Sequence, residues 1–226
     1  MAQNTNHYAG DGRYPGSYYA ASANEAPIRP ALEGSVDCDV CVVGAGYSGL
    51  SAALALAEKG HNVVVVEGAR VGWGASGRNG GQVVNGLNAS LETIGNRYGM
   101  EVGAFVGKLV QEGGRIIRER VDKYDIQCDL KDKNLYAAFH PKQLRELEEK
   151  QKLWRRYGMD DHEILDADAM GQHVGSDAYV GGMIDHSGGH MHPLNLCLGE
   201  AAAFEQNGGV IYEMSPVVLS LIHISE

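Results

Sequence analysis

The sequence has few cysteines, few basic residues and no long hydrophobic run, and each scarcity excludes a class of protein. Four cysteines in 226 residues are too few for a disulfide-based scaffold. Lys and Arg number 19 against 29 Asp and Glu, a net charge of −10, which argues against nonspecific nucleic-acid binding. No apolar run approaches the roughly 18 residues of a membrane span, and residues 1–30 lack the apolar core of a secretory signal. We therefore expect a cytoplasmic protein that binds neither nucleic acid nor membrane, with its oligomeric state left open.

Glycine, in contrast, is abundant. The 31 glycines are about twice the usual 7% share, which indicates many turns and close backbone approaches. Hydrophobic residues make up 44% and charged residues 21%, as in a globular protein with a hydrophobic core. The length allows one large domain or two small ones.

Cys38 and Cys41 form an isolated C-x-x-C motif within an expected strand. A zinc site needs a second ligand pair at suitable spacing, whereas Cys128 and Cys197 stand alone. A redox-active pair normally lies at a helix N-terminus, and this pair does not. We expect buried structural thiols and no metal site.

The most informative motif is a glycine-rich turn between an apolar strand and a helix. Residues 36–43 predict a strand, the G-x-G-x-x-G of residues 44–49 a turn and helix start, and four valines at 63–66 a second strand that ends at Glu67. This order is typical of a βαβ unit that binds a dinucleotide. Glu67 lies 18 residues after the third glycine, near the roughly 20 expected of a carboxylate that binds ribose hydroxyls.

Each position of this motif has a distinct physical role. Gly44 permits the tight turn, Gly46 lets the backbone approach a pyrophosphate, and Gly49 lets the helix pack closely on the sheet. The helix N-terminus at Tyr47 and Ser48 presents unpaired amides to the phosphates. The acidic residue at the end of the second strand disfavours NADP but does not separate NAD from FAD.

A second glycine-rich loop, residues 72–82, follows the expected ribose-binding carboxylate. Its five glycines let backbone amides approach a ligand closely. Arg78 adds charge for a phosphate or a polarised ring, and Ser76 and Asn79 add hydrogen-bonding groups. The position of the loop indicates a ligand that extends further along the sheet edge, which fits FAD better than NAD.

The remaining segments predict further helices and short strands. Expected helices cover residues 90–124 with an interruption near 99, 141–157, 166–173 and 193–207, and expected strands cover 128–130, 135–139, 179–184 and 210–213. In the helix at 141–157, Glu146/Lys150 and Glu148/Lys152 are four residues apart. We interpret them as ion pairs on a solvated face.

The two glycine-rich motifs together resemble the D-amino-acid-oxidase-like family of FAD-dependent amine oxidoreductases. The resemblance rests on residues 44–49, Glu67 and the sequence GASGRNGGQ at 74–82. Further stretches at 17–24, 112–120 and 185–195 resemble one amine-oxidising branch of that family. The similar region spans about residues 17–218.

This resemblance implies an α/β fold, a Rossmann-like βαβ unit with a central parallel sheet that binds FAD, joined to helical and short antiparallel β segments that face the substrate. It implies a small-molecule amine as substrate. By motif position it implies FAD contacts at Gly44, Gly46, Tyr47, Ser48, Gly49, Glu67, Ser76, Arg78, Asn79, Gly80, Gly81, Gln82, Val217 and Val218. The expected division is an N-terminal arm at 1–33, the first part of the FAD domain at 34–90, a helical substrate-facing region at 91–178, and a return to the FAD domain at 179–226.

Alternatives to this function are an oxidase or dehydrogenase for glycine, sarcosine or another small amine, and a noncatalytic module that binds FAD or another nucleotide. Family members are much longer, so we expect a truncated fold, and an isolated chain that binds FAD poorly and oxidises no substrate. Residues 219–226 depart from the family pattern. We expect this tail to be non-native, with natural truncation as the alternative.

Asp185, His186, His190 and His192 are residue types that bind metals. The interleaved glycines and the proline at 193 instead favour a loop near the flavin or substrate, and simple turn formation and helix capping is a third interpretation. His190 and His192 are the candidates for catalytic contact with a ligand.

Overall fold

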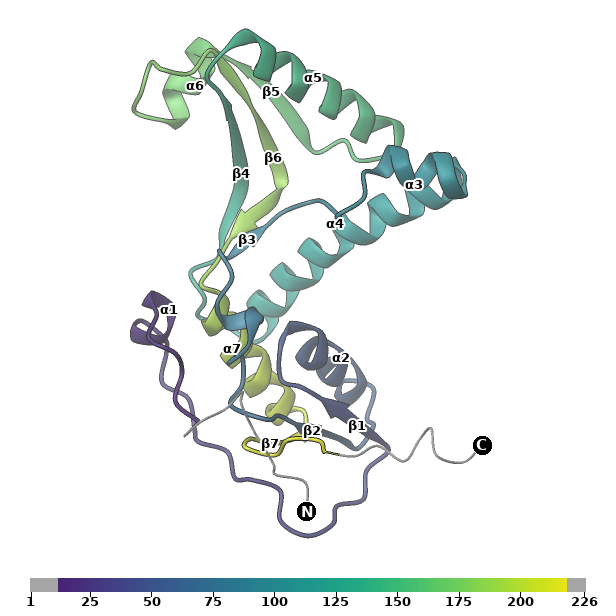
Figure 1. Cartoon of the computed structure of the whole chain (residues 1–226), viewed down its shortest axis with the longest axis vertical. Coiled ribbons are helices and arrows are strands. Elements are labelled where there is room, and N and C mark those ends of the chain that lie inside the picture. The colour runs from purple at the N-terminus through teal and green to yellow at the C-terminus, as the bar shows by residue number, and fades with distance from the viewer. Residues whose placement is uncertain (1–11, 219–226) are drawn as a thin grey trace. The chain divides into compact units, whose positions relative to one another are not determined.

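The computed structural model describes residues 12–218, which form two compact units, each assembled from separate stretches of the chain. The parallel unit comprises the residues up to Gly80, Arg120–Cys128 and those from His192 onward. The antiparallel unit comprises Gly81–Glu119 and Asp129–Met191. Figure 1 labels their helices and strands. Within residues 12–218, no helix is long and apolar enough to cross a membrane.

The parallel unit is built on a three-stranded parallel sheet of order β1-β2-β7. Strand β1 (Val40–Val43) pairs in register with β2 (Val63–Val66), and β2 pairs with β7 (Val210–Tyr212). All four β2 valines are buried, as expected of a central parallel strand covered on both faces. The α/β architecture predicted from the sequence is confirmed.

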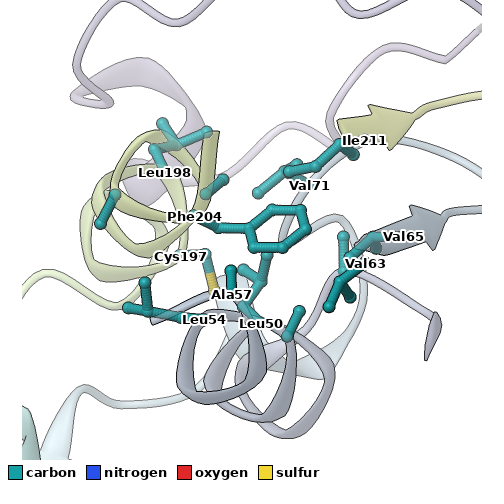
Figure 2. Packing of buried hydrophobic residues seen from close by; sticks show 14 of the residues in the cluster. Leu50, Leu54, Ala57, Val63, Val65, Val71, Cys197, Leu198, Phe204 and Ile211 are labelled. Carbon is teal, nitrogen blue, oxygen red and sulfur yellow. The ribbon is translucent and has the colours of Figure 1, made fainter. Parts of the chain in front are cut away.

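Helices α2 (Tyr47–Ala57) and α7 (Pro193–Gln206) pack together against this sheet and form its hydrophobic core. Phe204 lies at the centre, fully buried between the two helices and the strands (Figure 2). Leu50 and Leu54 reach it from α2, one helical turn apart. The apolar spacing of the sequence therefore predicts correctly which face of α2 is buried.

The exposure of Cys41 corrects the expectation that both cysteines of the C-x-x-C motif are buried. Cys38 is half-buried and Cys41 is exposed, so Cys41 is not a buried structural thiol. Burial alternates along β1, and Cys41 points to the more exposed face of the strand. The two cysteines form no disulfide.

The N-terminal arm is anchored on the parallel unit. It carries a short helix, α1 (Tyr18–Ala21), capped by the Ser17 hydroxyl. The Tyr14 hydroxyl donates to the Val71 carbonyl at 2.7 Å, and burial raises the pKa of Tyr14 to about 12. Tyr19 packs against the hydrophobic core of this unit, whereas Tyr18 is exposed.

A buried ion pair ties the end of α4 (Met100–Lys123) into the parallel unit. The Arg120 guanidinium donates from Nη1 to Glu200 on α7 at 2.9 Å and to the Ser51 hydroxyl on α2 at 2.7 Å. Both charged side chains are at most one-tenth exposed. This pair fixes three helices at one point.

The antiparallel unit is a sheet centred on β6 (Gly181–His190), which pairs with all three of its other strands. These are β3 (Gln82–Val83), β4 (Lys131–Ala138) and β5 (His162–Asp166). The expected strand at 179–184 is too short, because β6 continues to His190, and the expected pair at 128–130 and 135–139 is instead the single strand β4.

Glycines explain why β6 resembles a loop in sequence. A Cβ at Gly189 would lie 2.4 Å from the carbonyl oxygen of Lys131, and one at Gly182 would lie 2.6 Å from that of Tyr136. Both glycines therefore serve close strand packing, not a turn.

Helices α3 (Leu91–Tyr98), α4, α5 (Pro141–Arg156) and α6 (Ala167–His173) complete the antiparallel unit, and a 3-10 turn, η1 (Ala75–Gly77), lies in the parallel unit. Gly99, with φ of +98°, separates α3 from α4, as the sequence predicts. On α5 the expected Glu146/Lys150 pair is wrong, since Glu146 pairs with Lys142 and Lys150 turns onto aromatic rings. Similarly, Lys152 pairs with Glu149 and not with Glu148.

Candidate functional site

The site begins at the turn between β1 and α2. Gly44 adopts φ of +96°, a left-handed conformation that favours glycine. A Cβ at Gly49 would lie 1.9 Å from the Gly44 carbonyl oxygen, so no side chain fits there. A Cβ at Gly46, which caps α2, would lie 2.8 Å from the Ser76 hydroxyl. The turn therefore brings bare backbone to the start of α2, as the sequence predicts.

Glu67 joins this turn to the end of β2. One carboxylate oxygen accepts from the Ala45 amide at 2.7 Å and the other from the Ala69 amide at 2.8 Å. A carboxylate oxygen has two lone pairs, so each oxygen keeps one for a further donor. The geometry suits a group that both shapes the turn and binds a hydroxyl.

A cavity of about 610 Å³ opens beside these residues. Its lining includes Gly44 and Glu67, and it also includes Arg78, Val217 and Val218, which lie far apart in sequence. The parallel sheet explains this meeting, because the segments that follow β1, β2 and β7 emerge at the same edge. Sequence reasoning missed eight other lining residues: Val43, Val66, Gly68, Ala69, Trp73, Gly74, Ser215 and Pro216.

The turn η1 docks on the N-terminus of α2. The Tyr47 amide donates to the Ser76 hydroxyl at 3.1 Å, and the Asn79 side chain donates to the Ser76 carbonyl at 2.8 Å. Burial raises the pKa of Tyr47, whose hydroxyl donates to the Pro193 carbonyl at 3.1 Å. Predicted residues of both glycine-rich motifs thus meet at one helix terminus.

Arg78 lies on the rim of the cavity. Its Nε donates to the Gly74 carbonyl at 3.0 Å, and its guanidinium stacks over the Trp73 ring at 5.0 Å. The indole N–H donates to the Arg13 carbonyl at 2.9 Å. The arm thereby positions the aromatic face on which this cation rests.

Four other predicted cofactor contacts are not among the residues that line this cavity. Ser48 and Gly80 are exposed in the parallel unit. Gly81 and Gln82 belong to the antiparallel unit, where Gln82 is opposite His190 in the pairing of β3 with β6. Their contact with a cofactor stays a prediction.

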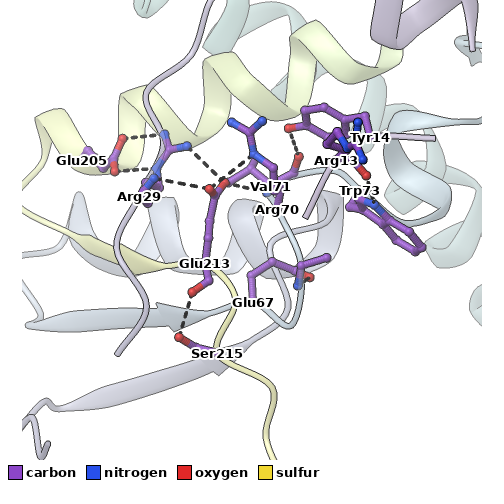
Figure 3. Close-up of polar contacts among 11 residues, drawn as sticks. Arg13, Tyr14, Arg29, Glu67, Arg70, Val71, Trp73, Glu205, Glu213 and Ser215 are labelled. Carbon is purple, nitrogen blue, oxygen red and sulfur yellow. Dashed lines mark hydrogen bonds and ion pairs between the residues drawn. The ribbon is translucent and has the colours of Figure 1, made fainter. Parts of the chain in front are cut away.

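A buried carboxylate that the sequence analysis did not single out organises the loop after β2. Glu213 is 1% exposed and accepts from the amides of Val71 at 2.9 Å and Arg29 at 3.3 Å. The guanidinium groups of Arg29 and Arg70 each approach it to 3.6 Å (Figure 3). The sequence signal was weak, since an acidic residue just after a short strand resembles an ordinary exposed loop residue.

The histidine-rich stretch does not converge on one point. Asp185 is fully buried, His186 pairs with Glu163 at 3.1 Å, and His190 is exposed on β6. Among residues 12–218, no group of three His, Cys, Asp or Glu side chains could hold a metal ion.

His192 belongs to the parallel unit and caps α7. Its Nδ1 accepts from the Asn195 amide at 3.1 Å, and its Nε2 lies 3.1 Å from the Ser22 hydroxyl. Both ring nitrogens are engaged in these contacts. A catalytic role for His190 or His192 stays a prediction.

Comparison with known proteins identifies the family. The family model described as "FAD dependent oxidoreductase" matches residues 39–222. The chain belongs to this family. The matched region includes every predicted cofactor contact.

Individual members of the FAD-dependent oxidoreductase family are also similar. The gamma-glutamylputrescine oxidoreductase of Escherichia coli is 53% identical over 89% of this chain and 47% of its own length. A probable oxidoreductase, OrdL, of Haemophilus influenzae is 44% identical with the same coverage. The chain therefore spans about half the length of these relatives. The L-amino acid deaminase of Proteus myxofaciens shares the fold, with a TM-score of 0.67 at 21% identity over 85% of this chain and 42% of its own.

Proposed function

We propose that this chain supplies the FAD-binding part of an oxidoreductase that oxidises a primary amine, and that the amine is gamma-glutamylputrescine. The observation that carries the cofactor assignment is the cavity that joins the β1–α2 turn, Glu67 and the segment after β7. The substrate assignment rests on the 53% identity to the E. coli gamma-glutamylputrescine oxidoreductase.

The residues of the cavity fit the ADP half of FAD. Next to the lining residue Gly44, the bare backbone at Gly46 and the N-terminus of α2 would offer amides and a positive dipole end to the pyrophosphate. Glu67 offers its free lone pairs to ribose hydroxyls. Backbone atoms of Val217 and Val218 would contact the adenine. A volume of about 610 Å³ lies within the usual range for cofactor pockets.

When bound, the flavin would supply the redox chemistry, a two-electron oxidation of the carbon that bears the amine, so that substrate, water and oxygen would give gamma-glutamyl-aminobutyraldehyde, ammonia and hydrogen peroxide. The protein's contribution is to hold the cofactor and the C–H bond in a reactive alignment. Ser76, Arg78 and Asn79 would act along the pyrophosphate and the ring.

A binding experiment tests the cofactor assignment. The chain is titrated with FAD and with FMN, which lacks the ADP half, while flavin fluorescence is followed. We expect weak but saturable binding of FAD by this partial chain, competition by ADP, and at least tenfold weaker binding of FMN. Equal binding of FAD and FMN, or no binding of FAD, would contradict the proposal.

A glycine pair provides the matched variants. Gly46→Ala places a methyl group where the pyrophosphate should approach, and its clash is with the terminal hydroxyl of Ser76, which rotation about one side-chain bond would relieve, so the fold should persist. Gly113→Ala on α4 adds a methyl group in open space. We expect the first variant to weaken FAD binding at least tenfold and the second to leave it unchanged.

The substrate assignment requires the complete protein. Peroxide release is compared for gamma-glutamylputrescine, putrescine, glycine and sarcosine under identical conditions. The proposal predicts the highest kcat/KM for gamma-glutamylputrescine, and a preference for glycine or sarcosine would replace it.

A further inference from the structure

A second cavity lies in the antiparallel unit, separate in its residues from the ADP site. It measures about 350 Å³, at the lower end of the range for small-molecule pockets. Loop 85–90 forms one wall, and side chains of α3, α4 and α5 form the others. The apolar lining residues include Leu91, Val110, Leu153, Trp154 and Met159.

Lys150 is the single charged residue in the lining of this cavity. Its ammonium lies 4.4 Å from the centre of the Trp154 ring and 4.6 Å from that of Tyr136. Among residues 12–218, no hydrogen bond or ion pair joins it to another side chain. Burial lowers the pKa of Lys150, as expected for a cation withdrawn from water without a carboxylate at contact.

The nearby acid is already committed to other groups. Asp185 is fully buried, and its carboxylate accepts from the Asn85 side chain at 2.9 Å, the Ser187 hydroxyl at 2.9 Å and the Gly188 amide at 3.1 Å. An ammonium has three N–H donors, and two ring faces can take at most two. The cavity therefore presents a cation with unused donor capacity above an apolar wall.

We propose that this cavity is a binding site for a small carboxylate with an apolar body, whose anionic end pairs with Lys150. An anion in the cavity would offset the unfavourable burial of the ammonium. The hydrocarbon part would cover Leu91, Leu153 and Met159. The N-terminus of α3, where Ser90 and Leu91 line the cavity, adds the positive end of a helix dipole.

A fluorescence titration tests this site without FAD or catalysis. In a Trp73→Phe background, Trp154 is the remaining tryptophan and reports directly on the cavity. Octanoate is the probe, and octanamide is its uncharged counterpart of the same length. We expect a saturable change in Trp154 emission with octanoate, and at least tenfold weaker binding of octanamide. Absence of saturation, or equal affinity for the two probes, would overturn the proposal.

Two lysines on α5 provide matched variants. Lys150→Met removes the charge and keeps an apolar side chain of similar length, whereas Lys152→Met changes an exposed lysine paired with Glu149. We expect octanoate affinity to fall at least tenfold in the first variant and to stay unchanged in the second. Lys150→Arg should retain binding, which separates the role of charge from that of packing. Equal octanoate affinity in all three variants would refute a role for Lys150. If Lys150→Met misfolds, the comparison of octanoate with octanamide still tests whether the cavity prefers a carboxylate.

Discussion

The buried Arg120–Glu200 pair allows a prediction with a magnitude. In Arg120→Met, Glu200 loses its cation and its 2.9 Å hydrogen bond while it remains about 3% exposed. Removal of one partner of such a buried pair costs about 3–5 kcal/mol, mainly because the remaining charge is left without compensation. The bonds from Arg120 to the hydroxyl and carbonyl of Ser51 are lost as well, at 2.7 Å and 3.0 Å. We therefore expect a loss of about 3–5 kcal/mol in the free energy of unfolding.

This loss should depend on pH in a defined direction. Burial raises the pKa of Glu200 even beside Arg120, and removal of the guanidinium should raise it further. The folded variant then binds more protons than the unfolded chain at any pH between the ordinary glutamate pKa and the raised one. Its stability therefore falls as pH rises through that window, so the deficit is greater at pH 8 than at pH 5.

Urea unfolding followed by circular dichroism measures the effect at both pH values. Lys123→Met on the same helix is the control, because it breaks an ion pair to Glu58 that is more than half exposed on the lysine side. The double variant Arg120→Met/Glu200→Met removes both charges and should recover most of the loss. The reasoning is refuted if Arg120→Met lowers the free energy of unfolding no more than Lys123→Met does. It is also refuted if the double variant loses as much stability as the Arg120→Met and Glu200→Met single variants added together.

Three further predictions follow from other contacts. Hydrogen bonds from Lys123 and from a tyrosine lower the pKa of Glu58. Its contribution to stability is therefore present above the ordinary glutamate pKa and is lost as pH falls through the lowered pKa. In Glu58→Gln, the free energy of unfolding should fall less steeply at acid pH, which unfolding curves at several pH values check. Gly49→Ala places a methyl group 1.9 Å from the Gly44 carbonyl oxygen and should lower stability by at least about 1–3 kcal/mol, and an unchanged melting temperature would contradict it. The exposed Cys41 should react fastest with a thiol reagent such as dithionitrobenzoate, and loss of the fast phase in Cys41→Ser checks that assignment.

The sequence predicts the parallel unit well because its signals are local. The run of four valines, the glycine spacing and the carboxylate at 67 each reflect a backbone constraint within one βαβ unit. The meeting of Glu67 with Val217 also follows, since segments after parallel strands emerge at one sheet edge. The predicted function at family level is confirmed by the match over residues 39–222.

The antiparallel unit was predicted less well because its contacts are remote in sequence. The glycines of β6 match a turn pattern, and only the close carbonyls of β4 reveal that they serve strand packing. Lys150 has an acidic residue four positions before it, which predicts a solvated ion pair, yet the rings of Trp154 and Tyr136 attract it instead. The spacing of residues along α5 carries no information about the Tyr136 ring, because that ring belongs to β4.

The contact between Arg29 and Glu213 has an evolutionary consequence. The two residues are 184 positions apart, yet the acid is almost fully enclosed and the arm provides one of its two cations. A change at either position removes one partner from a buried network in which Arg29 also bonds Glu205 and Glu213 also faces Arg70, so substitutions at the two sites should tend to appear together among homologues. Chimeras that graft the arm of one relative onto the body of another should be more stable when Arg29 and Glu213 are inherited from the same parent.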